Sequence, residues 1–531
     1  MTLKAIMKGT SLKRAMVIAA AGILPTAVLS DEVALKSADG TVNLVGEFVE
    51  FKDDNYVIRT ALGDLRISAA RVRCEGAACP VFETETADVV FAGSDTLGLG
   101  MMPLLISGYA SFLDAEASTK ATGQEGQLLS SLISDGGFGD EIGYYIVTSS
   151  SSSSEISNLL DTSARIGMSS RRILPAEARE LKADGAGNMI SPRQEHIVAV
   201  DSLVVITNPS NPIETLTIEQ LAGIYTGQIT NWSEVGGDDA PIRVLNRQDD
   251  SGTRAVFENA VFGDDAEATT GIGETIADNN NMAATVNEDA NAVGFVGYAF
   301  QRGAKPISLV NSCGITTTPD AFSAKTEEYA LQRRLYLYNR ADNMSESSQQ
   351  FIDYATSAEA DGVIAKAGFI DLGIRAQPME MDGARAQMLL DPNVDAYEGG
   401  VMRAMLSEMV NYDRLSTTFR FKTGSSKLDE RGLIDMARLA NYLETQPAGT
   451  KITFVGFTDD VGAFDSNRLL SENRAALALQ ELQNFAGDRL ANIEFATLGF
   501  GEVAPSGCNT NEQGRGINRR VEVWIQADRQ G

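Results

Sequence analysis

One stretch of the chain predicts a strand that runs directly into a helix: Val244-Leu-Asn-Arg247-Gln-Asp249-Asp-Ser251-Gly252-Thr253-Arg254-Ala-Val-Phe257. The first turn of a helix presents N–H groups without intrahelical partners, and Gly252 lets an oxyanion approach the backbone. Arg247 can bind two oxygens at once, and Asp249 is placed to hold its guanidinium still. An ordinary serine N-cap beside a surface arginine explains the same letters. The stretch alone leaves an anion site and a plain cap as equal alternatives.

Short apolar runs surround this stretch between about residues 84 and 375 and alternate with helical segments. The runs are Asp88 to Ala92, Ile142 to Val147, Leu203 to Thr207, Ile242 to Asn246 and Ala292 to Val296. Alternation of this kind is typical of an α/β domain, here with a largely parallel sheet.

Length and composition limit the class of protein. The 531 residues are 43% hydrophobic and 22% charged, which predicts several folded domains. A net charge of −28 argues against nucleic-acid partners. With one histidine, His196, and four scattered cysteines, no metal site or catalytic triad is readily assembled. We therefore expect no metal, no cofactor and no enzymatic activity.

The N-terminus predicts export. Lys4, Lys8, Lys13 and Arg14 precede an apolar stretch from Ala15 to Leu29 that is too short to span a bilayer. We interpret residues 1–30 as a cleaved signal peptide, with the mature chain in an oxidising compartment outside the cytoplasm.

Residues 31–80 alternate apolar and polar side chains and predict a small β module. Cys74 and Cys79 lie five residues apart around a glycine, which favours a local disulfide over two free thiols. Cys313 and Cys508 fall in different predicted domains, so we assign them no partner and their pairing stays open.

The C-terminal third has two parts. In residues 376–415, expected to be a linker with a helix, Met402, Met405, Leu406 and Met409 share one helical face. We interpret this stripe as packing on its own domain rather than as a partner surface. Residues 416–531 predict a compact two-layer α+β domain. Its expected elements are a strand at 419–423, a helix at 433–444, a strand at 451–456, a helix at 467–485 and strands at 493–499 and 519–525.

Several segments of residues 81–375 resemble periplasmic phosphate-binding proteins of the PstS type, the substrate-capturing component of ABC importers. These segments are Gly93-Ser94-Asp95-Thr96-Leu97, Ile166-Gly-Met-Ser169-Ser170-Arg171, Asp201 to Pro209, Leu216 to Trp232, the stretch around Arg247 and Ala292 to Tyr298. The resemblance implies a type II binding-protein fold whose two lobes close on inorganic phosphate by hinge motion. The implied ligands are Ser94, Thr96, Arg247, Ser251, Gly252 and Thr253, with Ser169 and Ser170 from the third loop.

Two departures from that family pattern leave alternatives open. Ser149 to Ser154 is a run of six serines where the family has a Ser/Gly-rich helix start. The run is either a second N–H nest or a flexible linker. Ser169 and Ser170 also stand where some members have an aspartate that accepts the proton of HPO4. A serine or Asp95 can take that bond, so we expect phosphate, and sulfate stays an alternative.

Residues 416–531 resemble the OmpA-like peptidoglycan-associating domain. The motif elements are Gly456-Phe-Thr458-Asp459-Asp-Val-Gly462, Asn467 to Ala475, Gly499-Phe-Gly-Glu and Gly514 to Val523, with Asp459 and Arg474 fifteen residues apart. By its chemistry Asp459 can pair with an ammonium and Arg474 with a carboxylate, which fits the zwitterionic end of a diaminopimelate stem peptide. The resemblance adds Thr458, Asn467, Arg515 and Arg519 to the groove. The plain alternative for Asp459 and Arg474 is a mutual surface salt bridge.

Together the two resemblances predict a multidomain, non-enzymatic binding protein of the periplasm, associated with the cell wall or outer membrane. It captures inorganic phosphate, docks on peptidoglycan and serves an ABC permease, with no nucleic-acid partner. A structural envelope protein, whose two-lobed domain grips another partner or has lost its ligand, is the alternative.

Overall fold

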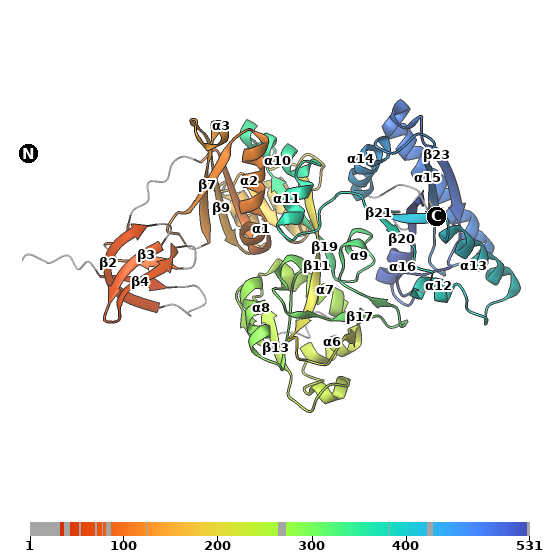
Figure 1. Cartoon of the computed structure of the whole chain (residues 1–531), viewed down its shortest axis with the longest axis horizontal. Helices are drawn as coiled ribbons and strands as arrows, with labels where there is room; N and C mark the ends of the chain where they lie inside the picture. The colour runs from red at the N-terminus through yellow and green to blue at the C-terminus, as the bar shows by residue number, and fades with distance from the viewer. Residues whose placement is uncertain are drawn as a thin grey trace, which may run out of the picture.

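The computed structural model shows three parts joined along the chain (Figure 1). It describes residues 32–36, 43–52, 55–69, 72–76, 78–80, 87–124, 126–263, 272–381, 383–421, 428 and 430–527. The expected signal peptide, residues 1–30, lies outside these ranges. In Figure 1 a small β module and a C-terminal domain flank a two-lobed domain. Across the described ranges, no helix combines the length and apolar character needed to cross a bilayer.

The β module is one antiparallel sheet with strand order β4-β3-β2-β1-β5. Its strands are β1 (Glu32–Lys36), β2 (Asn43–Lys52), β3 (Asn55–Thr60), β4 (Gly63–Ser68) and β5 (Arg73–Glu75). The predicted disulfide between Cys74 and Cys79 is present, with their Cα atoms 5.9 Å apart. The buried face of the sheet packs against Ala121 and Leu128 of the neighbouring domain.

The first lobe of the two-lobed domain, called lobe 1, contains parallel strands covered by helices (Figure 1). Its strands are β6 (Val89–Ser94), β7 (Glu116–Ala121), β8 (Gln127–Ile133), β9 (Glu141–Ser150) and β10 (Ile166–Ser169). Its helices are α1 (Asp95–Gly100), α2 (Met102–Phe112), α3 (Ser134–Gly137), α4 (Ser154–Leu160), α5 (Pro175–Ala183), α10 (Glu346–Thr356) and α11 (Asp361–Lys366).

Lobe 2 is formed by the middle of the chain. Its strands are β12 (Thr215–Thr217), β13 (Arg243–Arg247), β14 (Glu274–Ile276), β15 (Ala292–Gly297), β16 (Lys305–Pro306), β17 (Ser308–Val310) and β18 (Thr316–Thr317). Its helices are α6 (Ile218–Tyr225), α7 (Gly252–Phe262) and α8 (Asn279–Glu288), and α9 (Ala321–Lys325) lies against the strand β11 that leads into the lobe. One hydrophobic core includes Phe91 and Leu105 of lobe 1 and Leu245 and Met282 of lobe 2, so the lobes are in contact.

Two long strands, β11 (Glu195–Thr207) and β19 (Gln332–Asn339), connect the lobes. They pair with each other, β11 continues onto β15 of lobe 2, and β19 pairs with β10 of lobe 1. All three pairings are antiparallel, and so are β7·β8 and β8·β9. The expectation of a largely parallel sheet is therefore wrong. The chain crosses between the lobes in opposite directions, and the β7–β9 meander has no crossover helices to enforce parallel pairing.

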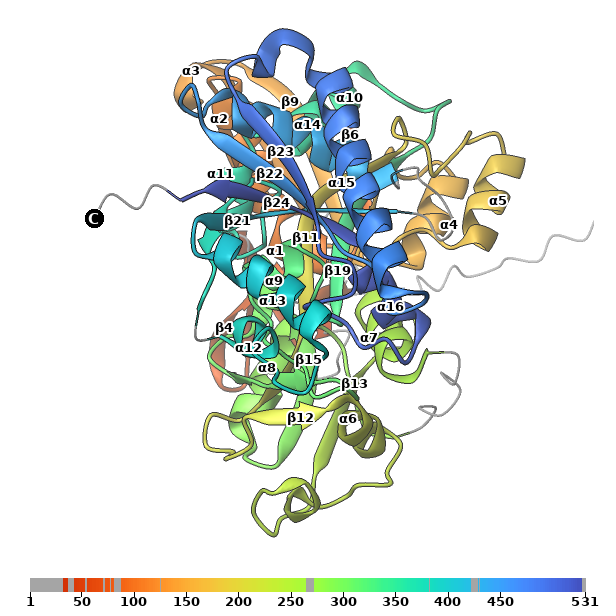
Figure 2. The same cartoon turned by 90° about the vertical axis from the view of Figure 1, so that its right-hand side faces the viewer.

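The C-terminal domain is built on a sheet with order β20-β21-β24-β22-β23. The strands are β20 (Ala376–Pro378), β21 (Tyr412–Arg420), β22 (Lys451–Gly456), β23 (Glu494–Gly499) and β24 (Arg520–Gln526). The helices are α12 (Ala384–Met388), α13 (Ala396–Met409), α14 (Glu430–Glu444), α15 (Phe464–Ala486) and α16 (Glu512–Asn518). Helices α14 and α15 pack on one face of this sheet. Figure 2 shows the strands of the sheet from the outer side of the domain.

Residues 376–415 do not form the expected linker. Strand β20 pairs with β21 at the sheet edge, and Met402, Met405 and Met409 of α13 pack with Val455 and Trp524. The methionine stripe therefore packs on its own domain, as expected, and gives the sheet a second helical layer. A stripe of buried apolar side chains has to be covered by something, and here the sheet's second face covers it.

The structure pairs Cys313 and Cys508, whose pairing the sequence left open. They form a disulfide, with Cα atoms 5.6 Å apart, between the loop that links β17 to β18 and a loop of the C-terminal domain. The two cysteines meet because the C-terminal domain docks on the two-lobed domain.

Candidate functional site

The ends of β13 and the start of α7 meet at the centre of the two-lobed domain. The Ser251 hydroxyl caps α7 by accepting from the Arg254 N–H at 3.4 Å. The helix begins at Gly252, which leaves the first-turn N–H groups of Gly252 and Thr253 without intrahelical acceptors. One turn therefore holds both the serine N-cap and two N–H groups that can donate to an anion.

Arg247 lies beside this helix start and is only 2% exposed. Its Nη2 atom donates across the lobes to Asp95 Oδ2 at 2.9 Å and to the Ala277 carbonyl at 3.2 Å. Its Nε and Nη1 atoms are buried and have no partner among the described residues. A buried guanidinium with two unsatisfied donors is costly unless a ligand completes it.

The expected role of Asp249 is wrong. Asp249 pairs with Arg254 and its side chain is 93% exposed, while Asp95 of lobe 1 holds Arg247. Asp249 comes two residues after Arg247, which ends β13, and at Asp249 the chain already turns outward to solvent.

Lobe 1 contributes Ser94 and Thr96, both fully buried at the junction of β6 and α1. The Ser94 Oγ atom has no partner in the described part of the chain. Thr96 Oγ1 accepts from Asn279 Nδ2 of lobe 2 at 3.3 Å. These contacts bring predicted ligand side chains of lobe 1 against a residue of lobe 2 in one buried region.

The serine run forms an ordered part of this site. β9 ends at Ser150 and α4 starts at Ser154, so the linker alternative does not hold. Ser152 is 1% exposed, and its Oγ lies 3.0 Å from Ser170 Oγ. A Cβ atom on Gly252 would lie 2.4 Å from Ser152 Oγ and 2.6 Å from Ser170 Oγ. Only glycine allows this approach of the helix start to the two hydroxyls.

Ser169, at the end of β10, is 1% exposed and is close enough to Glu155 to lower the pKa of its carboxyl. Glu155 is 1% exposed, and burial raises the pKa of its carboxyl to about 8 against the opposing effects of Ser169 and Arg171. The carboxyl is therefore largely neutral at pH 7 and does not repel an anion.

Thr253 is held by the crossing strands. Arg333 Nη1 donates to Thr253 Oγ1 at 2.9 Å, and Arg333 is paired with Asp201 through two bonds of 2.7 and 2.9 Å. Because the Thr253 oxygen accepts from Arg333, its own proton is free to point toward a bound anion. Arg333 sits on β19 and Asp201 on β11, so the hinge itself orients a predicted ligand.

A second candidate site lies in the C-terminal domain. Arg474 of α15 is 7% exposed and stacks on the Phe421 ring at 5.6 Å, and burial lowers its pKa. Its Nε and Nη1 atoms and the Thr458 hydroxyl are buried without partners among the described residues. Among the described residues, Arg474 makes no salt bridge with Asp459. The alternative, a mutual surface salt bridge between these two residues, is therefore not present.

The remaining groove residues form a polar chain. Asp459 Oδ2 accepts from Arg519 at 2.7 Å, and Arg519 also pairs with Glu512 at 2.6 Å. Arg515 binds the same Glu512 and the Asn509 carbonyl. Asn467 donates to the Asp459 carbonyl and to Glu502. The structure thus brings Thr458, Asp459, Asn467, Arg474, Arg515 and Arg519 together on adjoining loops and helices.

Sequence reasoning missed Ser152, Asn279 and Arg333 as parts of the first site. Nothing distinguishes Ser152 within a run of identical residues, since only the folded turn between β9 and α4 buries it. Arg333 carries no local motif, and its role depends on a crossing strand 80 residues from Thr253. In the described part of the chain, no three His, Cys, Asp or Glu side chains group as metal ligands.

Two family models match this chain, the PBP superfamily domain over residues 114–359 and the OmpA family over residues 420–519. The chain joins a PstS-like PBP superfamily domain to an OmpA domain. The expected fusion and fold class are confirmed, and we refer below to the PBP domain and the OmpA domain.

The chain is similar to several curated proteins. Phosphate-binding protein PstS of Borreliella burgdorferi is 27% identical over 226 residues, 42% of this chain and 77% of that protein. PstS of Bacillus subtilis is 28% identical over 177 residues, 33% of this chain and 57% of that protein. Outer membrane porin F of Pseudomonas aeruginosa is 34% identical over 115 residues, 22% of this chain and 32% of that protein.

Among solved structures, a phosphate ABC transporter substrate-binding protein of Clostridium perfringens with bound phosphate is 27% identical. Its alignment covers 53% of this chain and 98% of that protein, with a TM-score of 0.41.

Proposed function

We propose that the PBP domain captures inorganic phosphate between its lobes without catalysing a reaction on it. The observation that carries this proposal is Arg247, 2% exposed, with two donors that have no partner among the described residues. Ser152 and Ser170 contact each other and Gly252 at the start of α7, where Thr253 follows, and Ser94 precedes Asp95, the partner of Arg247. A tetrahedral oxyanion can accept from hydroxyl, N–H and guanidinium groups at once. The similarity to proteins named for phosphate binding supports phosphate as that anion.

Isothermal titration calorimetry tests this assignment. Phosphate should bind with measurable heat, sulfate should bind more weakly, and Arg247→Ala should weaken the binding of both anions at least about a hundredfold. Absence of heat with either anion would favour the alternative function, an envelope protein whose PBP domain has lost its ligand or grips another partner.

The OmpA domain docks on peptidoglycan through the groove at Arg474. Its buried donors on Arg474 and Thr458 suit a carboxylate, and Asp459, with its partner Arg519, suits the adjacent ammonium of a diaminopimelate stem peptide. Co-sedimentation of the protein with purified cell-wall sacculi tests this. Such docking locates the protein in the periplasm, at the wall or outer membrane, and raises the local concentration of the phosphate site there.

Delivery of the captured phosphate to an ABC permease completes the proposal. A deletion strain starved of phosphate should then take up phosphate more slowly than the parent. An unchanged uptake rate would leave capture and wall docking in place and remove the importer.

A further inference from the structure

The OmpA domain contacts the PBP domain at three separate places, which we call the three anchors. They are a lobe 2 anchor at the Cys313–Cys508 disulfide, a hinge anchor at Glu327, Glu328 and Arg334, and a lobe 1 anchor at Asp361. We propose that the OmpA domain acts as a bracket that holds the two lobes closed, so that its position controls phosphate release. This inference rests on the proposed phosphate function, which it extends.

The lobe 2 anchor is covalent. Cys313 lies in the loop between β17 and β18, and β17 pairs with β12 of lobe 2. Leu309 of β17 belongs to the lobe 2 core together with Leu221 and Phe257. The loop that carries Cys508 is therefore bound to move with lobe 2.

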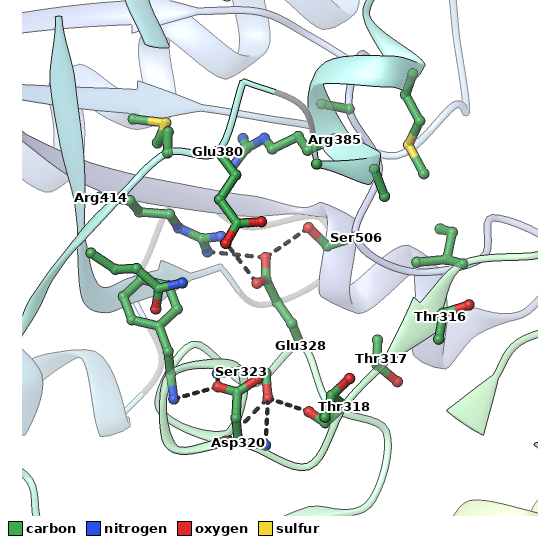
Figure 3. Close-up of a pocket in the computed structure, with 18 of the residues that line it drawn as sticks. Thr316, Thr317, Thr318, Asp320, Ser323, Glu328, Glu380, Arg385, Arg414 and Ser506 are labelled. Atoms are coloured by element: carbon green, nitrogen blue, oxygen red, sulfur yellow. Dashed lines mark hydrogen bonds and ion pairs between the residues drawn. The ribbon is translucent and has the colours of Figure 1, made fainter. Parts of the chain in front are cut away.

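The hinge anchor is a set of buried ion pairs. Arg414 of β21 forms two bonds of 3.0 Å to Glu328, which also accepts from Ser506 at 2.7 Å beside a cavity of about 360 Å³ (Figure 3). Burial raises the pKa of Glu328, but Arg414 and Arg520 outweigh it and bring the pKa down to about 2, so the carboxylate is charged at neutral pH. Arg420 binds Glu327 at 3.0 Å.

The hinge strand itself links the two sites. Consecutive residues of a strand point to opposite faces. On β19, Arg333 donates to Thr253 in the phosphate site, and Arg334 donates to Asp435 of α14 at 3.1 Å. Two neighbouring side chains thus connect the anion site to the OmpA domain.

The lobe 1 anchor is Arg438 of α14. Its Nη1 atom donates to both carboxylate oxygens of Asp361 at 2.9 and 2.7 Å, and its Nη2 atom donates to the carbonyls of Thr356 and Ser357. Asp361 begins α11 and Thr356 ends α10, and both helices pack on α2 of lobe 1. Because the OmpA domain is covalently bound to lobe 2, separation of the lobes has to break these bonds. The docked domain therefore favours the closed form over the open one.

The test compares phosphate release from the full chain and from its Arg438→Ala variant, with labelled phosphate chased by excess unlabelled phosphate. We expect release to become roughly fivefold faster, at the low end of typical couplings between sites. Asp361→Asn should have the same effect, and the double variant should add little to either. Arg489→Ala is the matched control, because Arg489 is a half-exposed arginine of the same domain 3.8 Å from Glu444. Release at the wild-type rate in both anchor variants would overturn the bracket.

A second measurement needs no phosphate. Hydrogen exchange of the ligand-free proteins over Asp95–Gly100 and Gly252–Phe262, where the lobes meet, should be faster in Arg438→Ala than in the wild type or in Arg489→Ala. If the wild type binds no phosphate but this exchange increases, the bracket stands and the proposed ligand fails. If exchange is unchanged in a variant that unfolds at the wild-type temperature, the bracket is wrong.

Discussion

The PBP and OmpA domains each bury an arginine with two donors that have no partner in the described part of the chain, yet they hold it differently. Arg247 is fixed by Asp95 from the opposite lobe, so its site exists only when the lobes meet. Arg474 rests on the Phe421 ring within one domain, so its position does not depend on two lobes meeting. In the proposed function, the same chemistry therefore serves capture and release in one domain and permanent docking in the other.

Arg247→Ala should have the largest effect of these variants, and it should act on the PBP domain alone. Loss of charged hydrogen bonds to a buried anion, each worth about 1.5–3 kcal/mol, predicts phosphate affinity at least about a hundredfold lower by calorimetry. Sedimentation with sacculi should not change. Arg243→Ala is the control, since Arg243 lies on the same strand but pairs with Glu274 and Asp289 near the surface. Retained phosphate affinity in Arg247→Ala would remove Arg247 from the site.

Glu155 should make the stability of the PBP domain depend on pH. The folded state keeps the Glu155 proton up to about pH 8, whereas the unfolded state loses it near 4.5. The folded protein therefore binds more protons between these values, and its stability falls as pH rises through this window. Between pH 6 and pH 8 the wild type should lose about 2 kcal/mol more unfolding free energy than Glu155→Gln, as measured in urea.

Glu180→Gln, an exposed acid on the neighbouring helix α5, is the control for this pH effect. Equal losses in the wild type and Glu155→Gln would mean that the carboxyl is already ionised at pH 6.

Arg474→Ala tests the groove side of the comparison. Removing the buried donors should reduce co-sedimentation with sacculi about tenfold, because a single charged pair of this kind contributes roughly 1.4 kcal/mol or more. Phosphate affinity should stay the same. Arg489→Ala serves again as a surface control, and unchanged sedimentation of Arg474→Ala would place wall contact elsewhere.

Gly252→Ala has the smallest expected effect. The added Cβ would stand 2.4 Å from Ser152 Oγ and 2.8 Å from Ser152 Cβ, so the helix start has to shift away from Ser152 and phosphate affinity should fall about fivefold. Gly362→Ala in α11 is the control, because a Cβ atom added at Gly362 would point into open space. An equal affinity in both variants would show that the helix start does not approach the anion closely.

Much of both sites was predictable because each motif is a local unit. The strand-to-helix junction at Ser251 and Gly252 positions its own N–H groups, and the loop after β22 positions Thr458 and Asp459. The sequence did not show which side chain holds or orients another when the true partner is distant in sequence. Asp95, not Asp249, holds Arg247, and Arg333 orients Thr253 from another strand.

The domain types, the strand-to-helix junctions and the local disulfide can be predicted from the sequence. Periodicity, capping and short spacings act over a few residues, so they leave a trace along the chain. Three features became visible only in the folded chain: residues 376–415 belong to the C-terminal domain, Cys313 is bonded to Cys508, and both lobes contact the OmpA domain. These features depend on which surfaces meet after folding, and the free energy of burying charged and apolar side chains between domains leaves no periodic trace along the chain.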